Sequence, residues 1–500
     1  MARRDDCRPN QVVIGGARSA PAPPYKSMIL TGHLSTSDKA RSDYAYIPFD
    51  VPAGIVRLDI RYSISHPRDA ADLRGEGNTI DIGIFDPRGH EFGTGRGFRG
   101  WSGSDRDRFF IAEDAATPGY LAGPIQPGEW HVIFGLYHLA EEGCDYQLEI
   151  EFTPGPSTLT AADPPTLPGF QPALNDTPGW VRGDLQCHTQ HSDAEGALDT
   201  LLSTARTRGL DFLAVTDHNT VSHIHEFPAQ AGQRPLLIPA TEVTTYAGHM
   251  NVWGLRAWQE FRCSAADRVA MRAIIDLAHA QGGLCSVNHP KTDGPPWEYG
   301  DLPYDCVEAW QAPWPFRNEE SLAFWDALLM AGRRVIAVGG SDYHQPLLPM
   351  QGRPHLLGQP TTWVYADALS VEGVLAGLRR GHACVSADID GARLDLRVFD
   401  GANWREMGDT ARPPTGEISV TGQVWDGAGG VLRLIADGAV IAEAPVDADD
   451  WRREWPRIAS PVRYLRSELI RRNLLIGGWM MLALGNPVFI RRGGSRWAPP

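Results

Sequence analysis

Two hydrophobic patterns divide the chain into regions. Between residues 28 and 153, runs that alternate apolar and polar positions are separated by turn sequences; the runs include VRLDIRYSI, TIDIGIFDPRG, EWHVIFGLYHL and DYQLEIEF. A period of two is typical of half-buried β-strands, and Asp-Pro-Arg-Gly is typical turn chemistry. The pattern predicts a β-sandwich over residues 28–153, preceded by a loose, polar lead-in at residues 1–27.

The pattern changes after a Pro-rich linker at residues 154–179. Apolar runs of strand length, such as LDFLAVTDH and LCSVNHP, then alternate with helical stretches such as AADRVAMRAIIDLAHAQGG. Strands alternating with helices indicate βαβ units and a mainly parallel sheet or barrel, which we place at residues 180–390. Alternating runs return afterwards, so residues 391–500 are predicted to form a small C-terminal β domain.

The apolar segment NLLIGGWMMLALGNPVFI, residues 473–490, is nearly long enough to span a bilayer as a helix. Gly-Gly and Gly-Asn-Pro sequences divide it into two runs of strand length, so two buried strands are predicted instead. The first residues, MARRDDCRPNQ, lack the apolar core of a signal peptide. We therefore expect a cytoplasmic protein without a membrane partner.

Charge and cysteine content narrow the classes of function. The formal net charge over 500 residues is −15, which argues against nonspecific binding of nucleic acid, because such binding requires basic patches. The seven cysteines are neither dense nor regularly spaced. Buried free thiols in a reducing compartment are therefore expected.

Almost every predicted strand of the 180–390 region ends in a residue that can bind a metal ion. These residues are His188, Asp193, Asp217, His218, Glu242, His249, His289, Asp342 and His344. The carboxyl ends of strands in a parallel α/β barrel converge on one face, where distant residues meet in one pocket. Imidazole together with carboxylate suits zinc, manganese or iron better than calcium. The pattern therefore predicts a metal centre.

The motifs HTQHSD, TDHN, TEVTTYAGHMN, NHP and GGSDYH follow one another along this region. In type and order they resemble the PHP (polymerase and histidinol phosphatase) superfamily of metal-dependent hydrolases. GHMNVWGL, NHPKTDGPPW, LGQPTTWVYA and LALGNPVFI are most similar to its CehA/McbA-like branch, which includes carbaryl hydrolase. The resemblance covers residues 180–390 and the C-terminal stretch, whereas the first domain matches only loosely, as an appended β-sandwich.

The resemblance implies an α/β fold, a distorted (β/α)7 barrel that holds two or three divalent ions of zinc, manganese or iron. The implied ligands are His188, Glu242 and Asp342 for the first ion, Glu242, His249 and His289 for the second, and Asp193, His218 and His344 for the third. Gln186 stands where the family usually has the first His of His-x-His. Because an amide oxygen binds zinc-like ions more weakly than imidazole, the first site is expected to have lower affinity, more oxygen ligands or partial vacancy.

Four further residues near the motifs are candidates for catalysis. Lys291 and Arg317 are candidates to hold a phosphate or to stabilise negative charge that develops in the reaction. A metal-bound water, His191 or His355 is expected to deliver the proton. His191 is also a candidate for the missing ligand, although we favour a place at the rim of the site.

An apolar wall is predicted beside the metals. Trp297, Trp310 and Trp314 follow the motifs and suit an aromatic or alkyl leaving group, and Tyr343 is expected to face the same pocket.

The leading hypothesis is a PHP-type phosphoesterase that attacks a small-molecule phosphoester with metal-bound hydroxide at a di- or trinuclear site. Hydrolysis of a carbamate or carboxyl ester, as the CehA-like resemblance implies, is the close alternative. A protein of another class would use the metal structurally and bind carbohydrate or cell-surface partners; Gln186 favours it, and eight retained ligand positions oppose it. A role in nucleic-acid binding is least supported, given the charge of −15.

Overall fold

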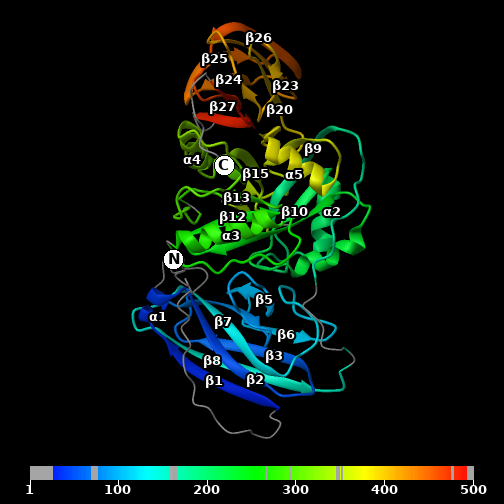
Figure 1. Cartoon of the computed structure of the whole chain (residues 1–500), viewed down its shortest axis with the longest axis vertical. Coiled ribbons are helices and arrows are strands. Elements are labelled where there is room, and N and C mark those ends of the chain that lie inside the picture. The colour runs from blue at the N-terminus through cyan, green and yellow to red at the C-terminus, as the bar shows by residue number, and fades with distance from the viewer. Residues whose placement is uncertain are drawn as a thin grey trace, which may run out of the picture.

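The computed structural model describes residues 26–68, 77–157, 159, 166–265, 267–292, 294–344, 349–350, 353–473 and 478–491. Figure 1 shows three parts stacked along the longest axis: strands β1–β8, a central region with the helices α2–α5, and C-terminal strands. Most of the predicted lead-in, residues 1–25, lies outside the described residues.

Two four-stranded antiparallel sheets form the first part, which we call the N-terminal sandwich. Their strand orders are β1-β8-β3-β6 and β2-β7-β4-β5. The elements are β1 (Ser27–Leu34), α1 (Thr36–Arg41), β2 (Tyr44–Val51), β3 (Ile55–Ile64), β4 (Thr79–Phe85), β5 (Phe98–Gly103), β6 (Arg108–Ala112), β7 (Gly128–His138) and β8 (Cys144–Pro154). Leu58, Trp130 and Leu148 belong to a single buried core that both sheets share. The alternating sequence pattern therefore corresponds to one buried face per sheet.

The central region combines one large sheet with five helical segments. Its elements are β9 (Gly179–Cys187), α2 (Leu198–Arg208), β10 (Phe212–Val215), η1 (Ser222–Gln230), β11 (Leu236–Thr245), β12 (Gly248–Trp253), α3 (Arg268–Ala280), β13 (Leu284–Val287), β14 (Cys306–Gln311), α4 (Asn318–Met330), β15 (Ile336–Gly340), β16 (Pro349–Met350), β17 (Arg353–Pro354), β18 (Thr361–Ala366), α5 (Val371–Arg380) and β19 (Ala383–Ser386). The neighbouring strands run β9 to β15 in sequence order. A parallel bridge between Cys187 and Tyr343 connects the end of β9 with the segment that follows β15.

This architecture confirms the mixed α/β class and differs from a regular (β/α)7 arrangement. Strands β9, β10 and β11 are parallel, as are β13, β14 and β15, but β12 is antiparallel to both of its neighbours. Only two residues separate β11 from β12, and so short a connection can join antiparallel strands only. The central region is therefore richer in strands than the resemblance implies.

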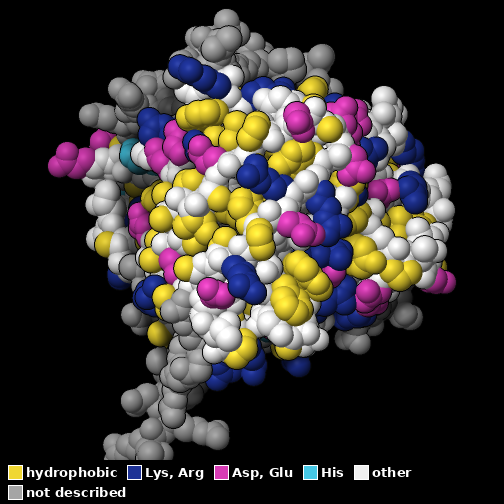
Figure 2. Space-filling view, turned by 90° about the horizontal axis from the view of Figure 1, so that it is seen from above, with side chains coloured by type: hydrophobic (Ala, Val, Ile, Leu, Met, Phe, Trp, Pro, Cys, Tyr) yellow, Lys and Arg dark blue, Asp and Glu magenta, His cyan; other side chains and the backbone are white. Residues whose placement is uncertain are grey.

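The C-terminal strands continue the large sheet, because β28 pairs with β19 and is followed by β27, β24 and β25. A second sheet of order β21-β20-β23-β26 shares a buried core with them. The elements are β20 (Arg393–Phe399), β21 (Trp404–Arg405), β22 (Thr410–Ala411), β23 (Glu417–Trp425), β24 (Val431–Ala436), β25 (Ala439–Pro445), β26 (Asp450–Ala459), β27 (Tyr464–Asn473), β28 (Gly478–Gly485) and β29 (Val488–Ile490). Seen from this end, acidic, basic and apolar side chains are interspersed on the surface (Figure 2).

Two smaller predictions are confirmed where the chain is described. The apolar segment 473–490 forms β28 and β29; its residues 474–477 lie outside the described part. Among the described residues, no helix is both long enough and apolar enough to cross a membrane. The six cysteines in the described ranges are free and buried.

Candidate metal centre

Strands β11 and β12 and the loops that follow the other central strands bring the predicted ligand residues into three adjoining groups. These are His188, Asp193, His218 and His344; His188, Glu242 and Asp342; and Glu242, His249 and His289. Within each group, one potential ligand atom per residue lies within 4.8 Å of the others. The structure thus gathers side chains from positions 188 to 344 at one end of the sheet.

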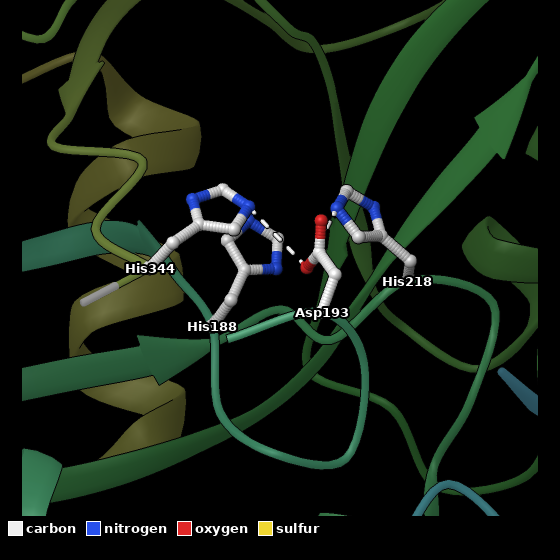
Figure 3. Close-up of side chains that lie close together, drawn as sticks. All are labelled: His188, Asp193, His218 and His344. Atoms are coloured by element: carbon white, nitrogen blue, oxygen red, sulfur yellow. Dashed lines mark ion pairs between the residues drawn. The ribbon is translucent and has the colours of Figure 1, made fainter. Parts of the chain in front are cut away.

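In the first group, three histidines surround Asp193, and the four side chains point toward one another (Figure 3). Asp193 Oδ1 lies 3.5 Å from His218 Nε2 and 3.4 Å from His344 Nε2. The His188 ring stacks against both of the others, with ring centroids 4.4 Å from His218 and 4.3 Å from His344. The Nε2 atoms of His218 and His344 face the shared Asp193 carboxylate, whereas His188 Nε2 lies 3.0 Å from Asp342 Oδ1.

The loop that carries His188 and Asp193 is held by a buried carboxylate, that of Asp217. Asp217 accepts hydrogen bonds from the backbone N–H of Thr189 at 2.8 Å, from the Thr189 hydroxyl at 2.7 Å and from the Ser192 hydroxyl at 2.7 Å. Asp217 therefore orients the ligand loop and lies in none of the three groups.

Glu242 connects all three groups because both of its carboxylate oxygens face histidines. Its Oε1 lies 3.0 Å from His249 Nδ1 and 3.4 Å from His289 Nε2. Its Oε2 lies 3.4 Å from His188 Nε2 and 3.3 Å from His218 Nδ1. The β11–β12 hairpin places Glu242 and His249 at the same end of the sheet, so a carboxylate on this hairpin is positioned to bridge two ions.

Two of these residues have an unusual backbone conformation. His289 has φ 28° and Asp342 has φ 56°, in the left-handed region that non-glycine residues seldom adopt. Such strain is concentrated at functional sites, where the surrounding structure holds it in place. Between them in sequence, Gly340 allows a close approach, because a Cβ there would lie 2.6 Å from Glu308 Oε1 and from Gln186 Cβ.

Gln186 lies fully buried against the carboxylates that the first ion would share. Its Nε2 donates to Asp342 Oδ1 at 3.2 Å and to Glu242 Oε2 at 3.3 Å. Its Oε1 is buried and has no hydrogen-bond partner, and His188 Nδ1 is in the same condition. An orphaned amide oxygen and imidazole nitrogen amid carboxylates fit a site built for a cation.

The charges of these side chains also fit the binding of a cation. Burial opposes ionisation of Asp193, but His218 and His344 outweigh it and hold the Asp193 pKa well below its usual range. Burial likewise lowers the His344 pKa, and the nearby Asp193 and Asp342 carboxylates overcome this and raise it to about 10. Without an ion, the cluster balances its carboxylates with protonated imidazole, a charge that a divalent cation would replace.

Three polar residues that were not predicted from the sequence touch the groups. Glu308, buried on β14, accepts a hydrogen bond from the His289 N–H at 2.9 Å, and burial together with Asp342 and Glu242 raises its pKa well above the usual range. Asn288 Nδ2 donates to Glu242 Oε1 at 2.9 Å. Gln311 Nε2 donates to Asp342 Oδ2 at 2.9 Å. A single acid within the apolar strand CVEAWQ was the available signal for Glu308.

The four predicted catalytic residues do not join the groups, and none lines the cavity described below. Lys291 is buried and donates to Gln311 Oε1 at 2.6 Å and to the Phe316 carbonyl at 2.7 Å. Arg317 is half-exposed and donates to Glu320 at 2.9 Å. The placement of both cations speaks against a direct contact with substrate, because nearby acceptors already engage them.

The other two candidates, His191 and His355, are also held by neighbouring polar groups. His191 Nδ1 lies 2.7 Å from the Ser222 hydroxyl and its Nε2 lies 2.9 Å from Glu226, so this ring does not replace the missing ligand. His355 is buried with its Nε2 against the Ser341 carbonyl. Both rings support the loops around the centre.

The centre opens into a cavity of about 790 Å³ that two regions enclose. The central region contributes Asp193, His218 and His249, and the N-terminal sandwich contributes Trp101 and Tyr137. The predicted apolar wall is different: Trp297, Trp310, Trp314 and Tyr343 are not among the residues that line the cavity. Trp310 is instead buried, with its indole N–H bonded to the Ala312 carbonyl at 3.0 Å.

No protein-family model matches the chain, and no curated protein matches its sequence significantly. Two solved structures are similar to it in part. A Bacteroides vulgatus two-domain protein, described as containing a PHP-like metal-dependent phosphoesterase by prediction, is 14% identical, with 64% of this chain and 97% of that one covered and a TM-score of 0.34. A Bifidobacterium adolescentis protein, a metal-dependent phosphoesterase by prediction, is 17% identical, with coverages of 39% and 95% and a TM-score of 0.24. At these TM-scores, any functional assignment depends on the side chains of the site.

Proposed function

We propose that the protein is a metal-dependent hydrolase of the PHP type and that it cleaves a phosphoester. The observation that supports this most strongly is the position of Glu242, buried and shared by histidines of all three groups. A carboxylate shared in this way suits a site of two or three adjacent cations. Such a site, beside an open cavity, suits hydrolysis better than a purely structural role.

The position of each residue indicates which ion it would hold. His188, Asp342 and Gln186 with Glu242 would hold the first ion, His249 and His289 with Glu242 the second, and Asp193, His218 and His344 the third. Bound divalent ions supply a nucleophile at neutral pH by lowering the pKa of water, and they neutralise charge on the phosphoryl group. Asp193 and His218 line the cavity, so the residues that would hold the third ion are where a substrate first meets the centre.

Cleavage of a neutral carbamate or carboxyl ester is the second candidate. The cavity supports it with one observation: none of the described residues that line the cavity is Lys or Arg. A neutral ester needs no cationic side chain. A phosphoester in this cavity would have only the bound metal ions to neutralise its negative charge.

The test combines metal analysis with a substrate panel. Purified protein is analysed for metal content and assayed with Mn²⁺ or Zn²⁺ on p-nitrophenyl phosphate, bis-p-nitrophenyl phosphate and 1-naphthyl carbamate. Two or three bound ions and turnover of a phosphate ester support the proposal, and turnover of the carbamate alone supports the second candidate. Bound metal without turnover of any of the three contradicts both and leaves a metal-binding protein.

A further inference from the structure

The N-terminal sandwich forms one wall of the cavity above the metal centre. Asp81 on β4, Trp101 on β5, Asp105 in the β5–β6 turn and Tyr137 on β7 all line the space that Asp193, His218 and His249 border from below. Ions bound by the three groups would hold the phosphoryl group, so a leaving group would occupy the opposite side of the cavity.

Hydrogen bonds fix this wall to the central region. Tyr246 donates to Asp81 Oδ2 at 2.6 Å. The Gly119 N–H donates to the Ser222 hydroxyl at 3.1 Å, and the Thr220 hydroxyl donates back to the Gly119 carbonyl at 2.8 Å. Because these contacts are buried, the sandwich is held in one position over the centre and acts as a fixed part of the pocket.

The wall carries the acidic side chains of Asp81 and Asp105, and none of the described lining residues is Lys or Arg. Burial raises the Asp81 pKa to about 6, and hydrogen bonds from Tyr246 and Ser104 oppose this. Burial raises the Asp105 pKa, the positive charge of Arg106 opposes this rise, and the negative charge of Asp193 adds to it. The nearest cation, Arg106, lies 3.5 Å from Asp105, but its guanidinium also donates to the Pro118 and Gln190 carbonyls.

Hydroxyl and aromatic groups complete the wall. Thr79, Ser102 and Ser104 lie beside the carboxylates, next to the rings of Trp101 and Tyr137. A hydroxyl both donates and accepts hydrogen bonds, as an alcohol does, whereas an ammonium group can only donate. Carboxylates accept hydrogen bonds from alcohols and repel a second anion. This combination favours a hydroxyl-rich, uncharged ligand.

We propose that the N-terminal sandwich selects the leaving group, and that it accepts a neutral, polyhydroxylated alcohol of sugar or polyol type and excludes leaving groups with a second anion. The inference rests on the proposed phosphoesterase function. It assigns Asp105 as a specificity residue, since its side chain lines the cavity from a turn and forms no part of the metal groups.

The test uses three phosphate esters of one carbon skeleton: glucitol 6-phosphate, 6-phosphogluconate and glucosamine 6-phosphate. They carry a neutral, an anionic and a cationic leaving group. We expect kcat/KM for glucitol 6-phosphate to exceed that for 6-phosphogluconate by at least roughly tenfold, from charge repulsion in the pocket. The Asp105→Asn variant should narrow this ratio by several-fold. Asp107→Asn, in the same turn, half-exposed and outside the cavity, is the matched control and should leave both this ratio and p-nitrophenyl phosphate turnover unchanged.

Binding provides a second measurement that does not depend on turnover. Calorimetric titration of the metal-loaded protein with glucitol and with gluconate should show binding of glucitol only, and Asp105→Asn should admit gluconate. Equal use of glucitol 6-phosphate and 6-phosphogluconate, a preference for the glucosamine ester, or equal effects of the Asp105 and Asp107 variants would overturn the inference. If p-nitrophenyl phosphate is still hydrolysed in these cases, the proposed phosphoesterase function is retained. If no phosphate ester is hydrolysed, both the proposed function and this inference are contradicted.

Discussion

Two buried clusters of charge in this protein are organised in opposite ways. At the boundary between the sandwich and the central region, Glu260 accepts hydrogen bonds from Arg262 at 2.6 and 2.8 Å, from the Arg262 N–H at 3.0 Å and from the Gly93 N–H at 2.7 Å. Arg262 also donates to the Tyr46 hydroxyl and the His90 carbonyl, both at 2.7 Å. Burial disfavours its charge, but Glu260 outweighs burial and raises the Arg262 pKa. The carboxylate and the guanidinium of this pair therefore compensate each other inside the fold.

The carboxylates of the metal centre are surrounded differently. It gathers carboxylates of Glu242, Asp342 and Asp193 with histidines, while Gln186 Oε1 and His188 Nδ1 remain buried and unpaired. A buried charge normally has a partner, so carboxylates beside an unpaired amide oxygen and imidazole nitrogen fit a cation. Glu260 is compensated by a guanidinium of the fold, whereas the carboxylates of the metal centre face histidines that can bind a cation.

The largest effect is expected from removing the shared carboxylate. Glu242→Gln should lower phosphate-ester turnover by at least roughly a thousandfold, because it weakens every ion of the centre. Elemental analysis should show that at least one ion is lost. Glu372→Gln, an exposed acid at the start of α5, is the control and should keep full activity. Unchanged metal content in the Glu242 variant would contradict the bridging role.

Replacing Glu260 in the Glu260–Arg262 pair should lower the stability of the protein and leave its metal content unchanged. Glu260→Gln leaves the buried Arg262 without its carboxylate and should lower the free energy of unfolding by about 3 kcal/mol. Urea unfolding measures this, and metal analysis should give the wild-type value. Glu443→Gln, which removes the carboxylate of an exposed pair with Arg433, should cost less than about 1 kcal/mol. Loss of metal from the Glu260 variant would erase the contrast between the two clusters.

The next effect concerns Gln186. Replacing the amide with imidazole in Gln186→His should tighten binding of one ion by roughly tenfold to a hundredfold, because imidazole is the stronger ligand for zinc-like ions. Competition with a chromophoric chelator measures the affinity, and Gln233→His at an exposed loop is the control. Identical affinity and stoichiometry in wild type and variant would show that position 186 does not contribute to the site.

The smallest expected effect is the release of a proton when metal binds. With its pKa raised to about 10, His344 is protonated in the metal-free protein at pH 8, and metal binding must displace that proton. Affinity should therefore rise with pH up to about 10, and calorimetry in two buffers of different ionisation enthalpy should report release of about one proton. A binding heat that is independent of the buffer would mean that His344 takes no part.

The sequence predicted the kinds of element better than their connections. Alternating runs in the first part predict strands because burial of one sheet face requires a period of two, and those strands are found. The antiparallel β12 was not predicted, because a hairpin inside a βαβ pattern leaves no periodic signal. The continuation of the large sheet from β19 into β28 joins residues about a hundred positions apart, which no local pattern reveals.

The candidate ligands could be named from the sequence because a metal demands particular side-chain chemistry, and His, Asp and Glu at strand ends are rare enough to stand out. The roles of Lys291, Arg317, His191 and His355 could not, since nearness in sequence to a motif does not fix where a long side chain points. In the structure, carbonyls, hydroxyls and carboxylates of neighbouring segments engage all four.

The sequence by itself determined the chemistry of the centre and the alternation that makes strands, because both depend on residue type and short-range spacing. Only the tertiary structure decided that Glu308, Asn288 and Gln311 contact these ligands. It also decided that the wall facing the metals comes from the N-terminal sandwich, through Trp101 and Asp105, and not from Trp310. Those arrangements depend on contacts between segments far apart in the chain, and such contacts exist only in the folded molecule.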